Sequence, residues 1–259
     1  WIPYPVPSAS TRWIGQDTGE GQDNRMNISD FVDVLDDGMP HFDFIMFDAC
    51  FMMSVEVAYE VRNYTDYYIG SPTENPGPGA PYDKVVPYMF KPGAAAQMAE
   101  AYFNHYKDNY KAGEGISNAN WTGGTSICAV RTDALDDLAD VTGQLLERAD
   151  NESVPSFNTV FDYDKRDMEE GHVGYYDFSQ MMEMRLDADA YVAWKNVFDA
   201  SIVYWNTTDK NYSMFKRMFS MEGTNGITHY IPLSVDSKAA EAYRSMAWYK
   251  AAGLENMGW

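Results

Sequence analysis

The sequence has 259 residues, 45% of them hydrophobic, which is enough for one large α/β domain or two smaller ones. Its 19 Lys and Arg against 39 Asp and Glu give a formal charge of -20, which repels nucleic acid and anionic membranes and attracts cationic partners. No apolar run approaches the roughly 20 residues of a membrane-spanning helix. The two cysteines, Cys50 and Cys128, exclude a disulfide framework, although one disulfide between them is allowed.

The first segment, residues 1–26, is rich in Pro, Ser, Gly and Asp and has no hydrophobic periodicity. It predicts an exposed loop that proteases can cut easily. A helix over 29–37 is expected next, since Asn27 or Ser29 can cap its start and Gly38 can end it.

The segment that follows predicts a βαβ crossover. Residues 43–47 (DFIMF) lack polar alternation, which is typical of a strand buried on both faces of a parallel sheet. Residues 53–63 are expected to form a helix and 65–71 a second strand, and the Gly/Pro-rich stretch 72–82 is expected to be a loop.

The second half of the chain predicts more helices than strands. Pro92 favours a helix start, and Met98, Tyr102 and Tyr106 share one face of that helix. The expected helices are 92–112, 134–150, 175–185 and 187–205, and 237–259 is expected to be a final helix and tail. The expected strands are 125–130 and 226–233. We expect one α/β unit over 27–259, with helical additions in its C-terminal half and with 150–172 as an acidic loop or insertion.

Cys50 lies in DFIMFDACFMMS, at the junction between the strand and the next helix. In open α/β sheets, functional residues collect at the carboxyl ends of strands. A thiol there should feel the positive end of the following helix, which would lower its pKa and favour the nucleophilic thiolate. The alternative is an inert buried cysteine, which is the common case. Cys128, in the middle of TSICAV, fits that alternative and is expected to be in the core.

The region around Cys50 resembles the clostripain family of cysteine peptidases. In that family the nucleophile lies in an Asp-Ala-Cys-x-Met step, followed by a Glu-bearing helix, a Tyr-rich strand ending in Ser, and a Pro/Gly loop that closes on Tyr. The matching positions here are Asp48, Ala49, Cys50, Met52, Glu56, Tyr59, Asp66, Tyr67, Ser71, Gly77, Gly79 and Tyr82. The match is specific over about 40 residues, and the later segments TSICAVRTDALDDLAD, YYDFSQMM and GITHYIPL match more loosely.

The resemblance implies a caspase-like fold, shared with gingipains and legumain, in which an α/β/α sandwich surrounds a mostly parallel sheet. It also implies a hydrolase with a Cys-His dyad that cleaves after Arg or Lys. Cys50 would be the nucleophile, and its main-chain amide would help to hold the oxyanion. Asp48 would line the S1 pocket, unless it caps the following helix instead. Ser71 is expected to contact substrate, and so is Glu74, the acid nearest to Pro78, where some relatives carry a second acid.

The dyad histidine is not evident among His41, His105, His172 and His229. His41 belongs to the wrong edge of the sheet, because nine extended residues separate it from Cys50 by about 30 Å. His105 falls within a helix and His172 in the acidic loop, and His229 shares its face with apolar residues and is interpreted as a packed side chain.

In clostripain relatives the histidine precedes the cysteine, in a His-Gly-x-Gly-Trp step. This chain begins at Trp1, as though at the last residue of that step. We therefore expect the catalytic histidine and the first strands of the sheet on another segment or chain. Relatives mature by internal cleavage into two associated chains, which makes Arg12 and Arg25 in the first segment candidate processing sites.

The remaining expectations concern metal, location and an alternative function. The acidic loop is dense enough in carboxylates for Ca²⁺, and the resemblance makes calcium activation conceivable. It lacks the Gly and spacing of an EF-hand, so a solvated loop is preferred and no metal site or cofactor is expected. The carboxylates concerned are Asp162, Asp164, Asp167, Glu169 and Glu170. The family suggests a secreted or cell-surface bacterial protein. The alternative to a peptidase is a caspase-like binding or scaffold module without catalysis.

Overall fold

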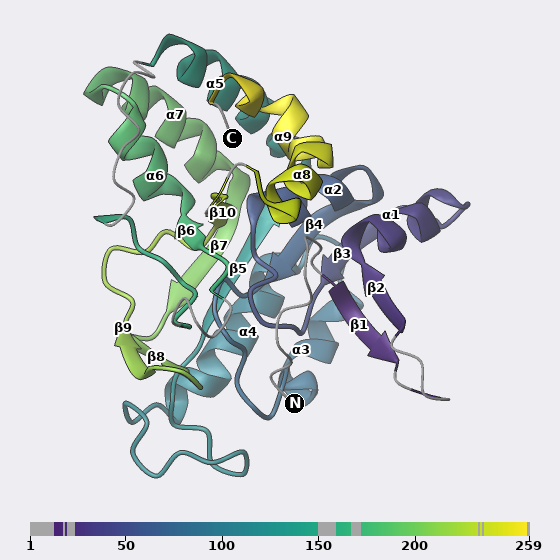
Figure 1. Ribbon diagram of the computed structural model, residues 1–259. Helices are drawn as coiled ribbons and strands as arrows, with labels where there is room; N and C mark the ends of the chain where they lie inside the picture. The colour runs from purple at the N-terminus through teal and green to yellow at the C-terminus, as the bar shows by residue number, and fades with distance from the viewer. Residues whose placement is uncertain are drawn as a thin grey trace.

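The structure is a computed structural model, and it describes residues 13–17, 19, 24–149, 159–166, 172–232, 234 and 236–257 (Figure 1). The strands are β1 (Trp13–Asp17), β2 (Asn24–Asn27), β3 (Phe42–Met46), β4 (Thr65–Gly70), β5 (Ser126–Arg131), β6 (Tyr175–Asp177), β7 (Ile202–Thr207), β8 (Lys210–Ser213), β9 (Arg217–Ser220) and β10 (Thr228–Tyr230). The α-helices are α1 (Ile28–Asp36), α2 (Val55–Val61), α3 (Tyr82–Met89), α4 (Ala95–Asp108), α5 (Leu135–Arg148), α6 (Phe178–Arg185), α7 (Ala188–Ser201), α8 (Lys238–Ser245) and α9 (Ala247–Ala251).

The main sheet has the strand order β3-β4-β5-β7. Strands β3 and β4 are parallel, as the predicted βαβ crossover requires, and α2 connects them. Strand β5 runs antiparallel to both of its neighbours, β4 and β7. Three of the four strands therefore point in the same direction, but only β3 and β4 form a parallel pair, so the sheet is mixed.

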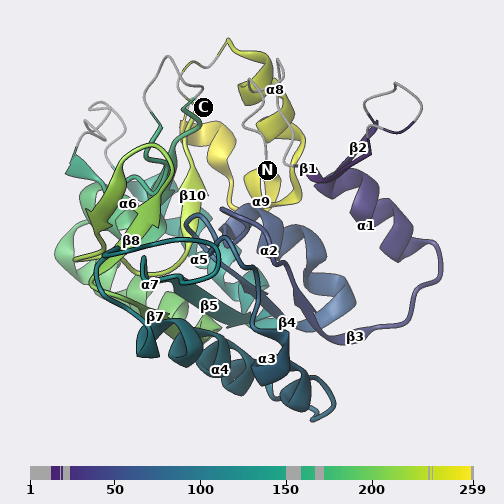
Figure 2. The same cartoon turned by 90° about the horizontal axis from the view of Figure 1, so that it is seen from below.

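Helices cover both faces of this sheet, which gives the expected three-layer α/β/α sandwich (Figures 1 and 2). On one face, Ile69, Ile127 and Ala129 pack with α3 and α4. On the other face, Tyr68, Cys128 and Val130 belong to a larger cluster with α2, α5, α6, α7 and α9. The alternation of these residues along β4 and β5 follows from the two-residue period of a strand. Cys128 is fully buried, which confirms its prediction as a core residue.

The carboxyl ends of β3 and β4 meet at one edge of the sheet, together with the start of β5. The segment after β3, with Cys50, and the loop after β4 lie at this edge. The C-terminal strand β10 also reaches it, because Thr228 forms a parallel bridge with Ser54 and donates its N–H to Met53 O at 3.1 Å. The sequence-distant β10 thus supports the segment that leads from Cys50 into α2.

Several predictions of secondary structure are wrong in part. Within 1–26, where a loop was expected, β1 and β2 form an antiparallel hairpin in which Gln16 pairs with Arg25; Arg12 lies outside the described residues. The helix expected over 187–205 ends at Ser201, and the β-branched and aromatic residues that follow form β7. Their strand propensity, together with pairing to β5, prevails over the helical pattern.

Within 237–259, where a final helix and a tail are expected, the helix divides into α8 and α9 at Met246, whose ψ of 147° is extended. The helix expected over 175–185 begins only at Phe178, because Tyr175–Asp177 form β6 and pair with β10. The β8–β9 hairpin and α3 are not expected from the sequence.

Candidate active site

The turn that carries Cys50 is bound to the strand and loop beside it. Phe47 N–H donates to Ile69 O at 3.0 Å, and Phe51 N–H donates to Thr73 O at 2.9 Å. Phe51 has a φ of 59°, in the left-handed region that a residue with a Cβ adopts only when its surroundings hold it there. Its ring stacks on Tyr175 with centroids 5.1 Å apart. Main-chain bonds and this stack therefore fix the residue directly after Cys50.

The Cys50 thiol is partly exposed and accepts a hydrogen bond from Asn75 N–H, with N and Sγ 3.2 Å apart. Burial raises the pKa of Cys50 to about 11. The Asn75 amide opposes this effect, whereas the negative charges of Glu74 and Asp48 add to it. Cys50 and Cys128 are both free thiols, so the disulfide that the composition allows is not formed.

The expectation that a helix dipole lowers the pKa of Cys50 is wrong. Helix α2 begins at Val55, five residues after Cys50, and its N-cap is Ser54, whose hydroxyl accepts from Val57 N–H. Because a helix dipole acts mainly within the first turn, it does not offset burial and the two nearby carboxylates.

Asp48 lies exposed beside the thiol, and its carboxylate is bound by the loop after β4. Oδ1 accepts from Asn75 Nδ2 at 3.0 Å, and Oδ2 accepts from Ala80 N–H at 2.8 Å and from the Tyr82 hydroxyl at 3.2 Å. A Cβ on Gly79 would lie 3.1 Å from Asp48 Oδ2, and the φ of +80° at Gly79 also favours glycine there. The alternative role as a cap of α2 is wrong, because Asp48 binds this loop and Ser54 caps the helix.

Ser71 and Glu74 support the same loop. Ser71 is fully buried, and its hydroxyl lies 3.2 Å from those of Thr73 and Ser126. In this conformation it connects the loop to the start of β5. The Glu74 carboxylate accepts from the Ser213 hydroxyl at 2.6 Å and from Met214 N–H at 3.0 Å, which joins the loop to the β8–β9 hairpin. Burial raises the pKa of Glu74. Substrate contact by either residue stays a prediction.

None of the four histidines is hydrogen-bonded to Cys50 within the described part of the chain. His41 pairs with Asp66 at 2.8 Å, at the edge where β3 and β4 begin, as its distance along the chain predicts. His105 is exposed on α4, and Asp162 binds His172 and raises its pKa.

His229 is fully buried, where it accepts from Trp248 Nε1 at 3.0 Å and packs on Phe178 with ring centroids 4.9 Å apart. Its interpretation as a packed side chain is confirmed.

The described part of the acidic loop is not a solvated segment. Asp164 is 3% exposed and binds the Arg166 guanidinium and Val173 N–H, both at 2.8 Å. Asp162 accepts from Asp164 N–H at 2.9 Å and from Tyr175 N–H at 3.1 Å. Among the described residues no three possible metal ligands form a cluster. Asp167, Glu169 and Glu170 lie outside them, so the expectations about calcium remain predictions.

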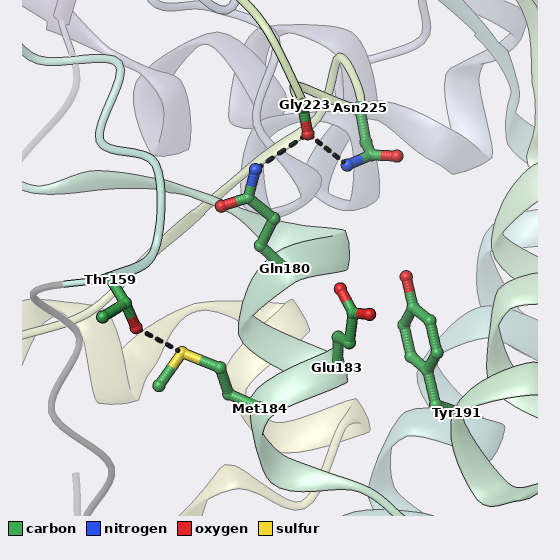
Figure 3. A pocket seen from close by; sticks show the side chains of 7 residues that line it. All are labelled: Thr159, Gln180, Glu183, Met184, Tyr191, Gly223 and Asn225. Carbon is green, nitrogen blue, oxygen red and sulfur yellow. Dashed lines mark hydrogen bonds between the residues drawn. The ribbon is translucent and has the colours of Figure 1, made fainter. Parts of the chain in front are cut away.

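A hollow of about 420 Å³ lies away from Cys50, between α6, α7 and the turn before β10 (Figure 3). Gln180 Nε2 and Asn225 Nδ2 both donate to Gly223 O there, at 2.8 and 3.1 Å, and Thr159 bonds Met184 Sδ. Several of these polar groups are therefore paired with one another.

Some residues of the candidate site could not be found from the sequence. Asn75 reaches both Asp48 and Cys50, but within TENPGPG it is one more turn-forming residue. The strained Phe51 and the contact of Thr228 with Met53 depend on tertiary structure, which a single sequence does not reveal.

Comparison with known proteins identifies the family to which this chain belongs. The model of the clostripain family matches residues 1–256. Among solved structures, a cysteine protease of B. fragilis is 38% identical with a TM-score of 0.86, over 95% of this chain and 99% of that one. A secreted C11 cysteine protease from Bacteroides thetaiotaomicron, in complex with an irreversible peptide inhibitor, is 41% identical with a TM-score of 0.84, over 97% and 69%.

A third structure is that of an inactive zymogen C11 protease from Parabacteroides distasonis. It is 27% identical with a TM-score of 0.73, over 88% of this chain and 62% of that one. The curated protein sequences contain no match to this chain. Since the family model spans nearly the whole sequence and two solved cysteine proteases are 38% and 41% identical to it where they align, this chain belongs to the clostripain family of cysteine proteases and has their caspase-like fold.

Proposed function

We propose that this protein is a secreted bacterial cysteine endopeptidase that cleaves after Lys or Arg, with Cys50 as its nucleophile. The observation that carries this proposal is the juxtaposition of a thiol and an exposed carboxylate at the carboxyl end of β3. Cys50 and Asp48 are two residues apart, and the loop after β4 binds both of them. A substrate whose basic side chain pairs with Asp48 would bring the next peptide bond to Cys50.

The thiol requires a base, because a group with a pKa of about 11 is almost entirely protonated at neutral pH. We assign that role to a histidine on a preceding segment or a separate chain. Support comes from β3, which is the end strand of the described main sheet. A parallel strand added beside β3 would end at the same edge as the Cys50 turn, and a histidine there would lie close to the sulfur.

In this mechanism the imidazole takes the proton from Cys50 Sγ, and the sulfur attacks the carbonyl carbon of the scissile bond. The Cys50 main-chain N–H donates to the resulting oxyanion. The imidazolium then gives its proton to the leaving amine, which leaves a thioester on Cys50. Water, deprotonated by the same imidazole, hydrolyses the thioester and restores the thiol.

Two further parts of the proposal rest on similar proteins. The relative from Bacteroides thetaiotaomicron is described as secreted, which supports secretion here, and within the described residues no helix has the length and apolar character to cross a bilayer. The relative from Parabacteroides distasonis is described as an inactive zymogen, which supports the existence of an inactive precursor of this protein. Calcium activation is kept as a secondary proposal, to be tested by activity before and after chelation.

The experiment is to label the intact enzyme with a peptidyl acyloxymethyl ketone that carries Lys at P1, and to map the adduct by mass spectrometry. We expect modification at Cys50, none at the buried Cys128, and none in Cys50→Ala. Modification at Cys128 would overturn the assignment. No modification, with the histidine-bearing segment present and the protein folded, would favour the alternative of a caspase-like binding module without catalysis.

A further inference from the structure

Asn75 forms two hydrogen bonds that connect the candidate S1 carboxylate to the candidate nucleophile. Its side-chain Nδ2 donates to Asp48 Oδ1 at 3.0 Å. Its main-chain N–H donates to Cys50 Sγ at 3.2 Å. When the side chain of Asn75 changes its partner, the position of the Asn75 main-chain N–H relative to Cys50 Sγ can therefore change as well.

The loop on either side of Asn75 is anchored, so its ends cannot absorb such a change by sliding. After Asn75, Gly79 N–H donates to Pro76 O at 2.8 Å, and the Tyr106 hydroxyl donates to Gly79 O. Before Asn75, the Glu74 carboxylate is bound by the β8–β9 hairpin through Ser213 and Met214. Between these anchors, the movement left to Asn75 is rotation about its own bonds.

The side-chain amide of Asn75 is also only half satisfied. Its Oδ1 atom is buried and has no hydrogen-bond partner in the described part of the chain. An ammonium or guanidinium group has donors and no acceptors. When such a group pairs with Asp48, it competes with Asn75 Nδ2 for the carboxylate, and it offers the missing donor to Oδ1 once the amide rotates.

We propose that Asn75 is a positioning residue that couples the binding of a cationic P1 side chain at Asp48 to the reactivity of Cys50. The proposal rests on the proposed cleavage after basic residues. It means that a basic P1 residue increases the rate of the chemical step in addition to the affinity. A neutral P1 residue leaves Asn75 bound to Asp48 and does not gain this increase.

The charges around the thiol also make Cys50 more reactive when a basic P1 side chain is bound. The titratable groups around the thiol are Asp48 on its own segment, Glu74 on the loop after β4 and Tyr102 on α4. Burial is the main cause of the raised pKa of Cys50, and the charges of Glu74 and Asp48 contribute to it. A cation paired with Asp48 offsets one of these charges and lowers the pKa of the thiol. The hydrogen bond between Asn75 and Asp48 adds an effect of geometry on the reactivity of Cys50. Substitution of Asn75 removes this effect, while the Asp48 charge stays.

The test compares two peptidyl acyloxymethyl ketones that differ only at P1, one with Lys and one with the neutral, similarly shaped norleucine. In each reaction the Cys50 sulfur displaces the acyloxy group from the methylene carbon, so that a thioether forms and a carboxylate leaves. The affinity KI and the maximal rate kinact are measured separately for the mature enzyme. In wild type we expect the Lys probe to be superior in both. In Asn75→Ala we expect the ratio of kinact values to fall severalfold, towards the smaller ratio that the Asp48 charge alone supplies, while the ratio of KI values persists.

Two variants control the experiment. Tyr82→Phe removes a different donor to Asp48, one that has no hydrogen bond to Cys50, and should leave the kinact ratio as in wild type. Asn75→Ser, with thermal unfolding measured for every variant, guards against an Asn75→Ala protein that does not fold. Equal losses of kinact for both probes in the Asn75 variants would show a structural role and overturn the proposal. A wild type without preference for the Lys probe in either constant would instead refute the proposed specificity.

Discussion

At the scale of single residues, the protein surrounds its candidate nucleophile with groups that suppress ionisation. With a pKa of about 11, the thiol is almost entirely protonated at pH 7.5. Burial is the main cause, and the carboxylates of Glu74 and Asp48 contribute. A thiol in these surroundings is protected from adventitious alkylation and oxidation, and it depends on an imidazole for activation.

Glu74→Gln should make Cys50 more reactive at pH 8. The anionic carboxylate raises the pKa of the thiol, so its removal lowers that pKa and moves the midpoint of the alkylation profile to lower pH. We expect iodoacetamide to react about two- to fivefold faster at pH 8, since the gain in thiolate is partly offset by lower nucleophilicity. The measurement is the alkylation rate of Cys50 from pH 6 to 11.

The matched control is Glu114→Gln, which removes the same charge from an exposed loop residue. It should leave the profile unchanged. A profile that moves to higher pH in Glu74→Gln would mean that loss of the contacts with Ser213 and Met214 dominates over loss of the charge.

Asp48→Asn should abolish the preference for basic P1 residues. Removing one partner of a desolvated charge pair costs about 2–5 kcal/mol, and the exposure of Asp48 in the unliganded site places the expected loss near the lower end. We therefore expect kcat/KM for a Lys substrate to fall by about 2–3 kcal/mol relative to a norleucine substrate. Equal losses on both substrates would show that Asp48 acts on the structure of the loop, through Ala80 and Tyr82.

At the scale of elements, the sequence predicts best where one local pattern decides. The βαβ unit of β3, α2 and β4 follows from two apolar runs and the segment between them, and the structure has it within a few residues. Strand β7 is hard to predict because it continues directly from α7, so that the end of the helix depends on pairing with β5 as well as on local strand propensity. The β8–β9 hairpin contains Met214 and Phe215 in place of the Asn-Gly or Asp-Gly steps that mark a tight hairpin.

In the candidate site, too, some features follow from a local sequence pattern and others depend on tertiary structure. Cys50 and Asp48 were identified because a polar step interrupts an apolar run and because that step resembles a known family. The pKa of Cys50 was predicted in the wrong direction, because it depends on burial and on Glu74, and neither is visible from the order of residues alone. The role of Asn75 depends on two hydrogen bonds to residues 25 and 27 positions away.

His229 belongs to the packing between β10, α6 and α9, and His229→Ala should therefore affect stability. The substitution leaves a cavity beside Phe178 and removes the acceptor of Trp248 Nε1, which together should cost about 2–4 kcal/mol. Urea unfolding measures this cost, and titration with the Lys acyloxymethyl ketone measures activity per folded molecule. We expect that specific activity to be retained at low temperature.

The exposed His105→Ala is the matched control, and it should change stability by less than about 0.5 kcal/mol. If His229→Ala were fully stable but inactive, His229 would have to be the catalytic base, contrary to its burial.

At the scale of the whole molecule, the formal charge of -20 suits an enzyme for basic substrates, because the field attracts cationic peptides before they reach Asp48. The three layers confine the candidate site to the edge where β3 and β4 end, and β10 supports that edge from the C-terminal part of the chain. Segments far apart in the sequence therefore build one site.

The last prediction concerns maturation. Within the chain before β3, the only basic side chains that a peptidase for Lys and Arg could recognise are Arg12 and Arg25. The bond after Arg25 lies inside β2, where Gln16 pairs with Arg25, so cleavage there requires the hairpin to open. The bond after Arg12 directly precedes β1, and its cleavage leaves the hairpin and the capped start of α1 intact. We therefore expect self-processing at Arg12-Trp13.

Full-length protein, Cys50→Ala, Arg12→Gln and Arg25→Gln should be expressed side by side, and their fragments measured by intact mass. Wild type and Arg25→Gln should be cut after Arg12, whereas Cys50→Ala and Arg12→Gln should stay whole. Cleavage of Cys50→Ala at the same bond would assign the cut to another protease. A wild type that is uncut and fully active would show that neither arginine is an activation site, because activity would then not depend on a break in the first segment.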